Sequence, residues 1–159
     1  MVLNEYKVTK KLYRQWGFEN AIKGVQLVFN ILWIVLSIFV LLLAMLESGD
    51  FLYYIIFAFC IYNAFFRWWV VTNFQYRILA KRYNCENWTR RIYFDQDTIR
   101  IEEASISVKY KYSDIVQIKE KDNSVWLKAS NKTVIRLYKD CFVESTWEDC
   151  KKLFPAELY

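Results

Sequence analysis

The candidate catalytic side chains in this chain are carboxylates and thiols, and their spacing argues against catalysis. The 159 residues include no histidine, so neither a Ser-His-Asp nor a Cys-His arrangement can form. Two carboxylate pairs, Asp95 with Asp97 and Glu102 with Glu103, fall at predicted turns or strand ends, where carboxylates are usually solvated. The sequence therefore predicts a protein that is not an enzyme and has no catalytic residues.

Metal and cofactor motifs are also missing from the sequence. The four cysteines, Cys60, Cys85, Cys141 and Cys150, lack the C-x-x-C spacing of a zinc site and do not indicate a disulfide framework. The three glycines are scattered, so there is no phosphate-binding loop and no dinucleotide fingerprint. We expect no metal, no cofactor and no nucleic-acid partner, and we expect the thiols to be reduced.

Two long apolar runs dominate the first half of the chain and predict a membrane hairpin. The first, Val25 to Leu46, carries no charge and as a helix would reach about 33 Å, against a hydrocarbon core of about 30 Å. The second, Phe51 to Val71, completes a span only with Arg67 and the residues after it, so we expect Arg67 to snorkel toward the headgroups. The alternative is a helix buried in a soluble protein.

The basic residues predict the orientation of this hairpin. They flank both runs and are missing from the linker Glu47-Ser48-Gly49-Asp50, which is acidic. They are Lys7, Lys10, Lys11, Arg14 and Lys23 before the first run, and Arg77, Lys81, Arg82, Arg90 and Arg91 after the second. By the positive-inside rule, we expect a multi-pass protein of the cell membrane with both termini in the cytoplasm.

Four polar residues predict a polar seam between the two membrane helices. Gln26 and Asn30 are four residues apart, as are Asn63 and Arg67, so each pair lies on one helix face. Asn30 and Arg67 fall at a similar depth near the cytoplasmic end of the hairpin. We expect interhelical hydrogen bonds of about 0.6 kcal/mol each to fix its register. An ion path would need a homo-oligomer, because two spans are too few for a pore.

Beyond the hairpin, period-two alternation predicts a β-rich domain of six antiparallel strands joined by polar turns. The expected strands are Arg91 to Asp95, Thr98 to Glu102, Ser105 to Tyr112, Ile115 to Lys121, Val125 to Ala129 and Thr133 to Tyr138. One apolar row, including Ile106, Val108, Tyr110 and Tyr112, should face the core. We expect Asp114 to bond nearby backbone at a strand entry, which is a structural role.

The last element predicted is a helix that covers the sheet. Ser145 can cap a helix from Thr146 to Phe154, and Glu148 would complete the capping box. Trp147, Cys150, Leu153 and Phe154 recur at spacings of three and four, so the helix has one apolar stripe, and Pro155 marks its end.

The sequence therefore predicts an α+β membrane protein in four parts. Residues 1–24 form a cytoplasmic tail, in which Val2 to Val8 could add an edge strand to the sheet and Thr9 could cap a helix running into the first span. Residues 25–71 form the transmembrane helical hairpin. Residues 72–89 form a basic and aromatic juxtamembrane helix and linker, anchored by Trp68, Trp69 and Trp88. Residues 90–159 form the cytoplasmic β-sheet domain with its C-terminal helix.

Several short motifs, in this order and spacing, resemble the YcxB-like family of small bacterial membrane proteins. They are Tyr6-Lys7-Val8-Thr9 with Tyr13 and Trp16, the two close spans, Arg91-Ile92-Tyr93-Phe94-Asp95, Thr98-Ile99-Arg100-Ile101-Glu102, Tyr112-Ser113-Asp114-Ile115, Val125-Trp126-Leu127, and Lys139 with Phe142. Tyr138 departs from the family pattern, which has a proline before the lysine. The resemblance implies a cytoplasmic domain similar to a pleckstrin-homology (PH) fold, and it assigns no catalytic or ligand residues.

These observations predict a non-catalytic, membrane-anchored binding or scaffold protein at the inner membrane surface. Its cytoplasmic domain would engage a protein or a lipid, and membrane lipids surround its hairpin. Exposed basic positions such as Lys109, Lys111, Lys128 and Arg136 could meet lipid phosphates or could form a solvated face. The alternative function is a toxin or bacteriocin immunity protein that acts through the hairpin. The sequence does not identify the partner and leaves a homo-oligomer open.

Overall fold

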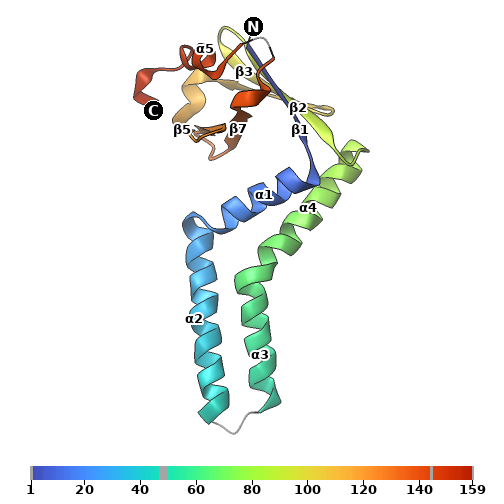
Figure 1. The fold of residues 1–159 in the computed structure, drawn as a ribbon, viewed down its shortest axis with the longest axis vertical. Coiled ribbons are helices and arrows are strands. Elements are labelled where there is room, and N and C mark those ends of the chain that lie inside the picture. The colour runs from blue at the N-terminus through green and yellow to red at the C-terminus, as the bar shows by residue number, and fades with distance from the viewer. Residues whose placement is uncertain (1, 47–49, 144, 159) are drawn as a thin grey trace. The chain divides into compact units, whose positions relative to one another are not determined.

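The chain folds into two units, one helical and one mostly β (Figure 1). The computed structural model describes residues 2–46, 50–143 and 145–158, so the expected loop at Glu47, Ser48 and Gly49 lies outside the described residues. The helical unit spans Thr9–Glu86, and the β unit combines the first strand with residues from Asn87 onward. The helical unit is therefore an insertion between the first two strands of the β unit.

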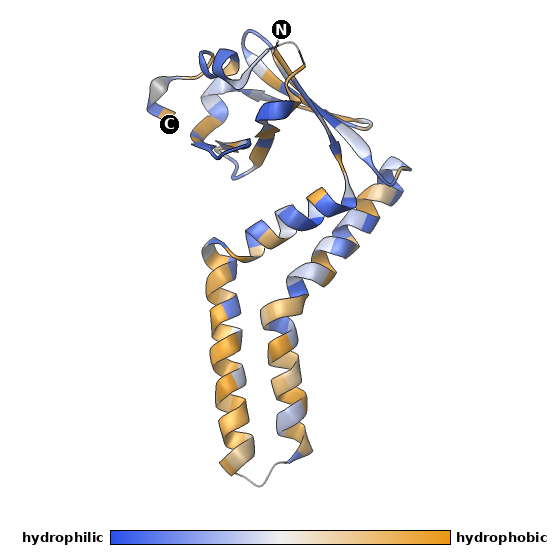
Figure 2. Cartoon of the chain, viewed as in Figure 1, coloured by the Kyte–Doolittle hydropathy of each residue, from blue (hydrophilic) through white to orange (hydrophobic). Residues whose placement is uncertain are grey.

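The helical unit contains two helical stretches that are long and apolar enough to cross a membrane, judged by length and composition. One is α2 (Gly24–Leu46), and the other runs from α3 (Phe51–Ile61) through a π-helical turn (Tyr62–Phe66) into α4 (Arg67–Tyr83). Most large apolar side chains of α2 and α3 are exposed, and Figure 2 shows hydrophobic colour along nearly the whole of both helices. The helices that the two apolar runs predict are present.

A further helix, α1 (Lys10–Ala21), packs against α4. Thr9 caps it as expected, because the Thr9 hydroxyl accepts a hydrogen bond from the Leu12 amide at 3.2 Å. The two helices approach so closely that a Cβ added to Gly17 would clash with the side chain of Thr72. The expectation that α1 runs on into the first span is wrong. A break separates α1 from α2, where Gly24 has a left-handed φ of +55°.

The π-helical turn contains Asn63, whose side chain bonds the backbone of the preceding turn. A π turn disrupts the regular hydrogen bonding of the helix around it. The Asn63 side-chain amide donates to the Phe59 carbonyl at 2.8 Å, and that carbonyl also accepts a hydrogen bond from the backbone amide of Tyr62. The Asn63 side chain is therefore directed at its own helix.

The β unit consists of two antiparallel sheets (Figure 1). Four strands pair in the order β1-β2-β3-β4, and three pair in the order β5-β6-β7. Their bounds are β1 Val2–Val8, β2 Trp88–Phe94, β3 Thr98–Glu103, β4 Ile106–Lys111, β5 Ile115–Glu120, β6 Ser124–Ala129 and β7 Val134–Tyr138. All six predicted strands are present, and β1 is the predicted edge strand. The α+β layout is therefore confirmed.

Long-range hydrogen bonds from β1 connect the two sheets at one side. The side-chain amide of Asn4 donates to the backbone carbonyl of Tyr138 at 2.7 Å, and the Tyr6 hydroxyl donates to the backbone carbonyl of Arg136 at 2.9 Å. Both side chains are buried, so these bonds satisfy polar groups inside the domain. The N-terminal strand therefore contributes to the core as well as to the sheet edge.

Two sequence expectations for the β unit are wrong in detail. The apolar row on β4 is only partly covered, since Val108 remains 42% exposed, because β4 is the outer strand of its sheet. Trp88 is 3% exposed inside the β unit, so it cannot be an interfacial anchor. It is buried because β2 begins at Trp88, earlier than the alternation indicated.

The final helix, α5 (Trp147–Lys151), is shorter than predicted and has a different cap. Thr146 is the N-cap, and its backbone and side chain make the reciprocal hydrogen bonds of a capping box with Asp149. The predicted box of Ser145 with Glu148 is wrong because the helix starts one residue later. Trp147, Cys150 and Phe154 of the predicted stripe are buried, whereas Leu153 is 39% exposed.

The cap predicts unequal effects for two neighbouring substitutions. Thr146→Ala should destabilise α5 by about 1 kcal/mol because it removes the N-cap. Ser145→Ala should change stability by less than about 0.5 kcal/mol, because no hydrogen bond of the Ser145 hydroxyl is found in the described structure. Hydrogen exchange of the α5 amides in the detergent-purified chain measures both. Equal effects would show that Thr146 is not the cap.

Candidate functional site

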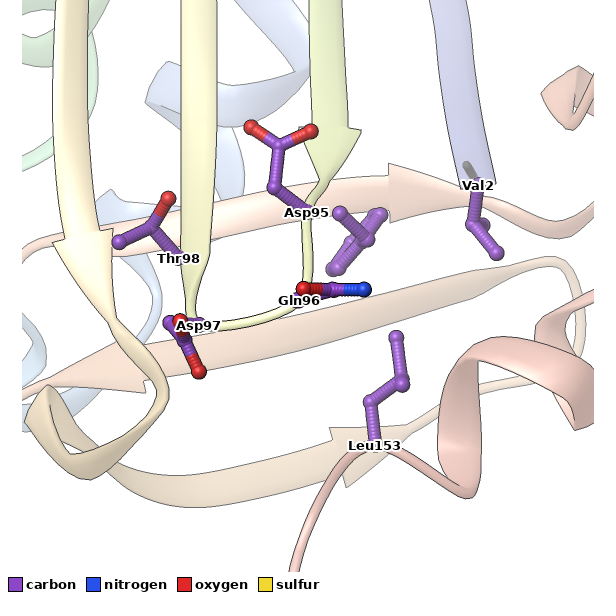
Figure 3. Close-up of a pocket in the computed structure, with 7 residues that line it drawn as sticks. Val2, Asp95, Gln96, Asp97, Thr98 and Leu153 are labelled. Atoms are coloured by element: carbon purple, nitrogen blue, oxygen red, sulfur yellow. The ribbon is translucent and has the colours of Figure 1, made fainter.

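The β unit has an open pocket of about 700 Å³ at one end of its four-stranded sheet (Figure 3). It lies between the start of β1, the β2–β3 turn and the segment after α5, and Figure 3 shows Leu153 pointing toward the turn. The lining residues are Val2, Phe94, Asp95, Gln96, Asp97, Thr98 and Leu153. An apolar floor with a polar rim is typical of a site that holds an apolar side chain and orients its polar neighbours.

The rim of this sheet-end pocket is acidic. Asp95 and Asp97 line it, and none of the described lining residues is basic. The Asp95 carboxylate lies 3.7 Å from Nε of Arg100, which offsets part of its charge, whereas Asp97 is exposed and has no ion-pair partner among the described residues. The Asp95 carbonyl accepts a hydrogen bond from the Tyr112 hydroxyl at 2.8 Å, and burial raises the Tyr112 pKa. The turn is therefore held in place while Asp97 stays accessible.

The pocket is far from the residues through which the chain leaves the β unit. Val2 pairs with Phe94 at the pocket end, whereas Val8 pairs with Trp88 at the other end of the same two strands. Val2 and Val8 are six steps apart along the strand, which is about 20 Å. The pocket therefore lies at the end of β1 and β2 opposite the residues where the chain passes into the helical unit.

A buried polar cluster lies on the inner face of the four-stranded sheet. The Arg90 guanidinium donates to both carboxylate oxygens of Glu103 at 2.9 Å and to the Tyr6 hydroxyl at 3.3 Å, and the Trp88 indole also donates to Glu103. Burial raises the pKa of Tyr6 to about 12. Burial acts to lower the Arg90 pKa, but Tyr6 and Glu103 outweigh it and raise that pKa above its usual value. The opposite charges of Arg90 and Glu103 pair within the domain, which supports a structural role for the cluster.

Glu120 joins the three-stranded sheet to the C-terminal segment. Its carboxylate accepts hydrogen bonds from Lys151 at 2.9 Å and from Lys139 at 3.3 Å. The hydrogen bond from Lys151 is the largest of the effects that lower the Glu120 pKa from 4.5 to about 2. A lowered pKa means that the folded state favours the ionised carboxylate, so its contribution is present above pH 4.5 and is lost as the pH falls toward 2.

We expect Glu120→Gln to be destabilising at neutral pH and neutral in strong acid. The loss should be at most about 1 kcal/mol, because this ion-pair network is partly exposed. Thermal unfolding of the detergent-purified chain, measured from neutral pH down to about 2, should show the difference from wild type shrinking as Glu120 protonates. Asp122→Asn is the matched control on the adjacent turn. A difference that does not change with pH would contradict the role of Glu120.

A second pocket, of about 250 Å³, lies in the helical unit and includes two of the four predicted seam residues. Gln26 and Arg67 line it together with Gly17, Asn20, Ala21, Trp68, Val71, Thr72 and Gln75. It is formed where α1 ends, α2 begins and α4 begins. The sequence missed it because α1 was expected to continue into the first span.

The other two seam residues have different partners. Asn30 accepts a hydrogen bond from Gln26 at 3.1 Å and donates one to the Ala21 carbonyl at 2.9 Å, while Asn63 bonds Phe59 of its own helix. Asn30 therefore connects α2 to the end of α1. Bonds that would set the register of α2 against α3 are not found for these four side chains in the described residues, and the seam stays a prediction.

Among the described residues, no group of three or more cysteine, aspartate and glutamate side chains could hold a metal ion. All four cysteines are free thiols. Burial raises the pKa of the Cys150 thiol, and burial together with Asp140 raises that of Cys141 to about 11, so both disfavour the thiolate. Of the two carboxylate pairs, Asp95 and Asp97 line the sheet-end pocket, whereas Glu103 pairs with Arg90 and Glu102 pairs with Arg100 at 2.6 Å.

The basic positions on the β unit separate into two kinds. Lys109, Lys111 and Lys128 are exposed and solvated. Arg136 is only 7% exposed, and its guanidinium lies 4.7 Å from the centre of the Trp126 ring, so the expectation that it belongs to a basic surface is wrong. Its place in the period-two pattern of β7 is that of a surface residue, but Trp126, its partner on β6, covers the side chain.

Comparisons with protein families, characterised proteins and solved structures found no match to this chain.

Proposed function

We propose that this chain is a non-catalytic, membrane-anchored binding protein whose β unit engages a protein through the sheet-end pocket. The acidic rim over an apolar floor carries this proposal. Asp95 and Asp97 would repel the anionic headgroups at a membrane surface, so they favour a polypeptide occupant with basic and apolar side chains over a lipid. Asp97 supplies an accessible charge, and Leu153 supplies exposed apolar area.

The proposed anchor is the helical unit. Its two long apolar stretches and exposed aliphatic surface support insertion into the cell membrane as a hairpin. Basic residues on both sides favour cytoplasmic termini. In this proposal the β unit, which is formed by the segments before and after the helical unit, lies in the cytoplasm. Its described strands and short helix would be arranged as in a PH domain. The YcxB-like resemblance is part of the same proposal.

Photocrosslinking in native membranes tests the function. A photoreactive residue replaces Gln96 at the pocket rim, Asp122 on the exposed β5–β6 turn outside the pocket lining, or Phe39 on the exposed face of α2. We expect a stoichiometric protein adduct from position 96 only. Adding Asp97→Lys should abolish that adduct by charge reversal, whereas Asp122→Lys should leave it unchanged.

Other patterns would contradict this function. Equal adducts from positions 96 and 122 would mean that capture is not specific to the pocket, and lipid adducts alone from position 96 would favour a lipid ligand. A protein adduct from position 39 alone would instead favour the alternative of an immunity protein acting through the hairpin.

A further inference from the structure

A cation with no counter-charge among the described residues lies in the pocket of the helical unit. Arg67 is exposed there, and no ion pair or hydrogen bond of its side chain is found in the part of the chain that the structure describes. The described lining residues include no acidic side chain. Arg67 also follows the apolar stretch of α3 and the π-helical turn, where an unneutralised charge is costly if the stretch lies in lipid.

The groups around Arg67 suit a phosphate with a polar substituent. Asn20, Gln26 and Gln75 contribute amides that can donate and accept hydrogen bonds, and Thr72 contributes a hydroxyl. Gln26 lies near the start of α2, where unsatisfied backbone amides favour an anion. Trp68 and Val71 contribute apolar surface beside these polar groups. A guanidinium binds phosphate oxygens with charge-assisted hydrogen bonds.

We propose that this pocket binds the phosphate of an anionic glycerophospholipid, with Arg67 as its main ligand. The phosphate would supply the negative charge that the pocket lacks, and the amides would bond the headgroup hydroxyls. The volume of about 250 Å³ is small, so it fits a headgroup and leaves the acyl chains outside. The glycerophospholipid is favoured over free phosphate because Val71, which lines the pocket, is itself an exposed apolar side chain.

Arg14 of the helical unit differs from Arg67 because its side chain has partners within the protein. Its Nε donates to Oδ1 of Asn73 at 2.8 Å, and its guanidinium lies 5.5 Å from the centre of the Trp69 ring. Arg14 therefore connects α1 to α4 within the protein. Arg67 has no such internal partner in the described chain, which is why it is assigned to a ligand.

Native mass spectrometry of the full chain in detergent tests the site. The probes are phosphatidylglycerol, phosphatidylcholine and inorganic phosphate. We expect wild type to prefer phosphatidylglycerol, and Arg67→Gln to weaken that binding by roughly tenfold, because it removes a charge-assisted contact. Arg77→Gln removes the same charge from an exposed position on the same helix outside the pocket, and it should leave binding unchanged. Gln26→Leu should weaken binding less than Arg67→Gln.

Three results would overturn the proposal. Equal losses in the Arg67 and Arg77 variants would indicate attraction to net charge alone, and unchanged binding in Arg67→Gln would remove the site. Displacement of the lipid by inorganic phosphate in an Arg67-dependent way would assign the site to free phosphate. Thermal unfolding of each variant checks that it is folded. The inference rests on the proposed membrane anchor, but its readout does not depend on the protein adduct at the sheet-end pocket.

Discussion

Replacing Arg90 with methionine should destabilise the β unit by about 3–5 kcal/mol, because Glu103 would be left as an uncompensated charge inside the domain. The side chains of Arg90 and Glu103 are each only 19% exposed. Loss of Arg90 also removes a donor to the Tyr6 hydroxyl, which itself connects β1 to β7. We expect unfolding at lower denaturant and faster hydrogen exchange in β1, β2 and β3 of the detergent-purified chain.

The next residue along the strand is a matched control. Arg91 also pairs with a glutamate, Glu5, at 2.7 Å, but those side chains are 49% and 36% exposed. Arg91→Met should therefore be much less destabilising than Arg90→Met, because solvent screens this exposed pair. The double variant Arg90→Met with Glu103→Leu should recover most of the loss, because it leaves no charge buried. Equal destabilisation by the two single methionine variants would contradict this account of the cluster.

The second large effect is expected for Phe154→Ala, which should cost about 3–5 kcal/mol. Phe154 is 6% exposed and contacts three aromatic rings: those of Tyr112, Phe94 and Trp147, with centroids 5.2, 6.3 and 6.3 Å away. Its removal opens a cavity where the segment after α5 covers the sheet. Denaturant unfolding of the purified chain, followed by near-ultraviolet circular dichroism, measures the change.

Leu153→Ala is the control for Phe154→Ala, and it also tests the proposed binding role of the pocket. Because its side chain is 39% exposed, Leu153→Ala should cost about 1 kcal/mol or less. Leu153 lines the sheet-end pocket, so the same variant should reduce the protein adduct from position 96 while the fold persists. A stable Phe154→Ala variant would show that the C-terminal segment is not part of the core.

Much of the local structure follows from residue pattern. The apolar runs predict α2 and α3, and period-two alternation predicts the six strands after the helices, because burial on one face leaves that signature. Thr9 and the asparagine and aspartate turns mark boundaries through local hydrogen bonds. The end of α1 and the start of α5 were placed less well, since adjacent residues offer similar caps and only the packed chain selects one of them.

The candidate sites needed more than pattern. Asp95 and Asp97 were recognised as a carboxylate pair at a turn, but their place beside Val2 and Leu153 depends on segments far apart in the chain. The sequence pointed to Gln26 and Arg67, but it predicted them as members of a polar seam with Asn30 and Asn63 and not as residues of one pocket. The break at Gly24 brings the end of α1 to the start of α2, and this makes a pocket that helical spacing alone does not reveal.

Residue pattern alone predicts the elements of the two units: two long apolar helical stretches, an antiparallel β unit and a C-terminal helix. It can do so because hydrophobic periodicity and turn chemistry act over a few residues. The folded chain brings distant segments together. It pairs β1 with β2 across the inserted helices, buries Arg90 with Glu103 and Arg136 under Trp126, and leaves Arg67 in a pocket whose described lining residues include no acidic side chain. Those outcomes depend on long-range burial, which changes the environment of a charged residue without changing its place in the local pattern.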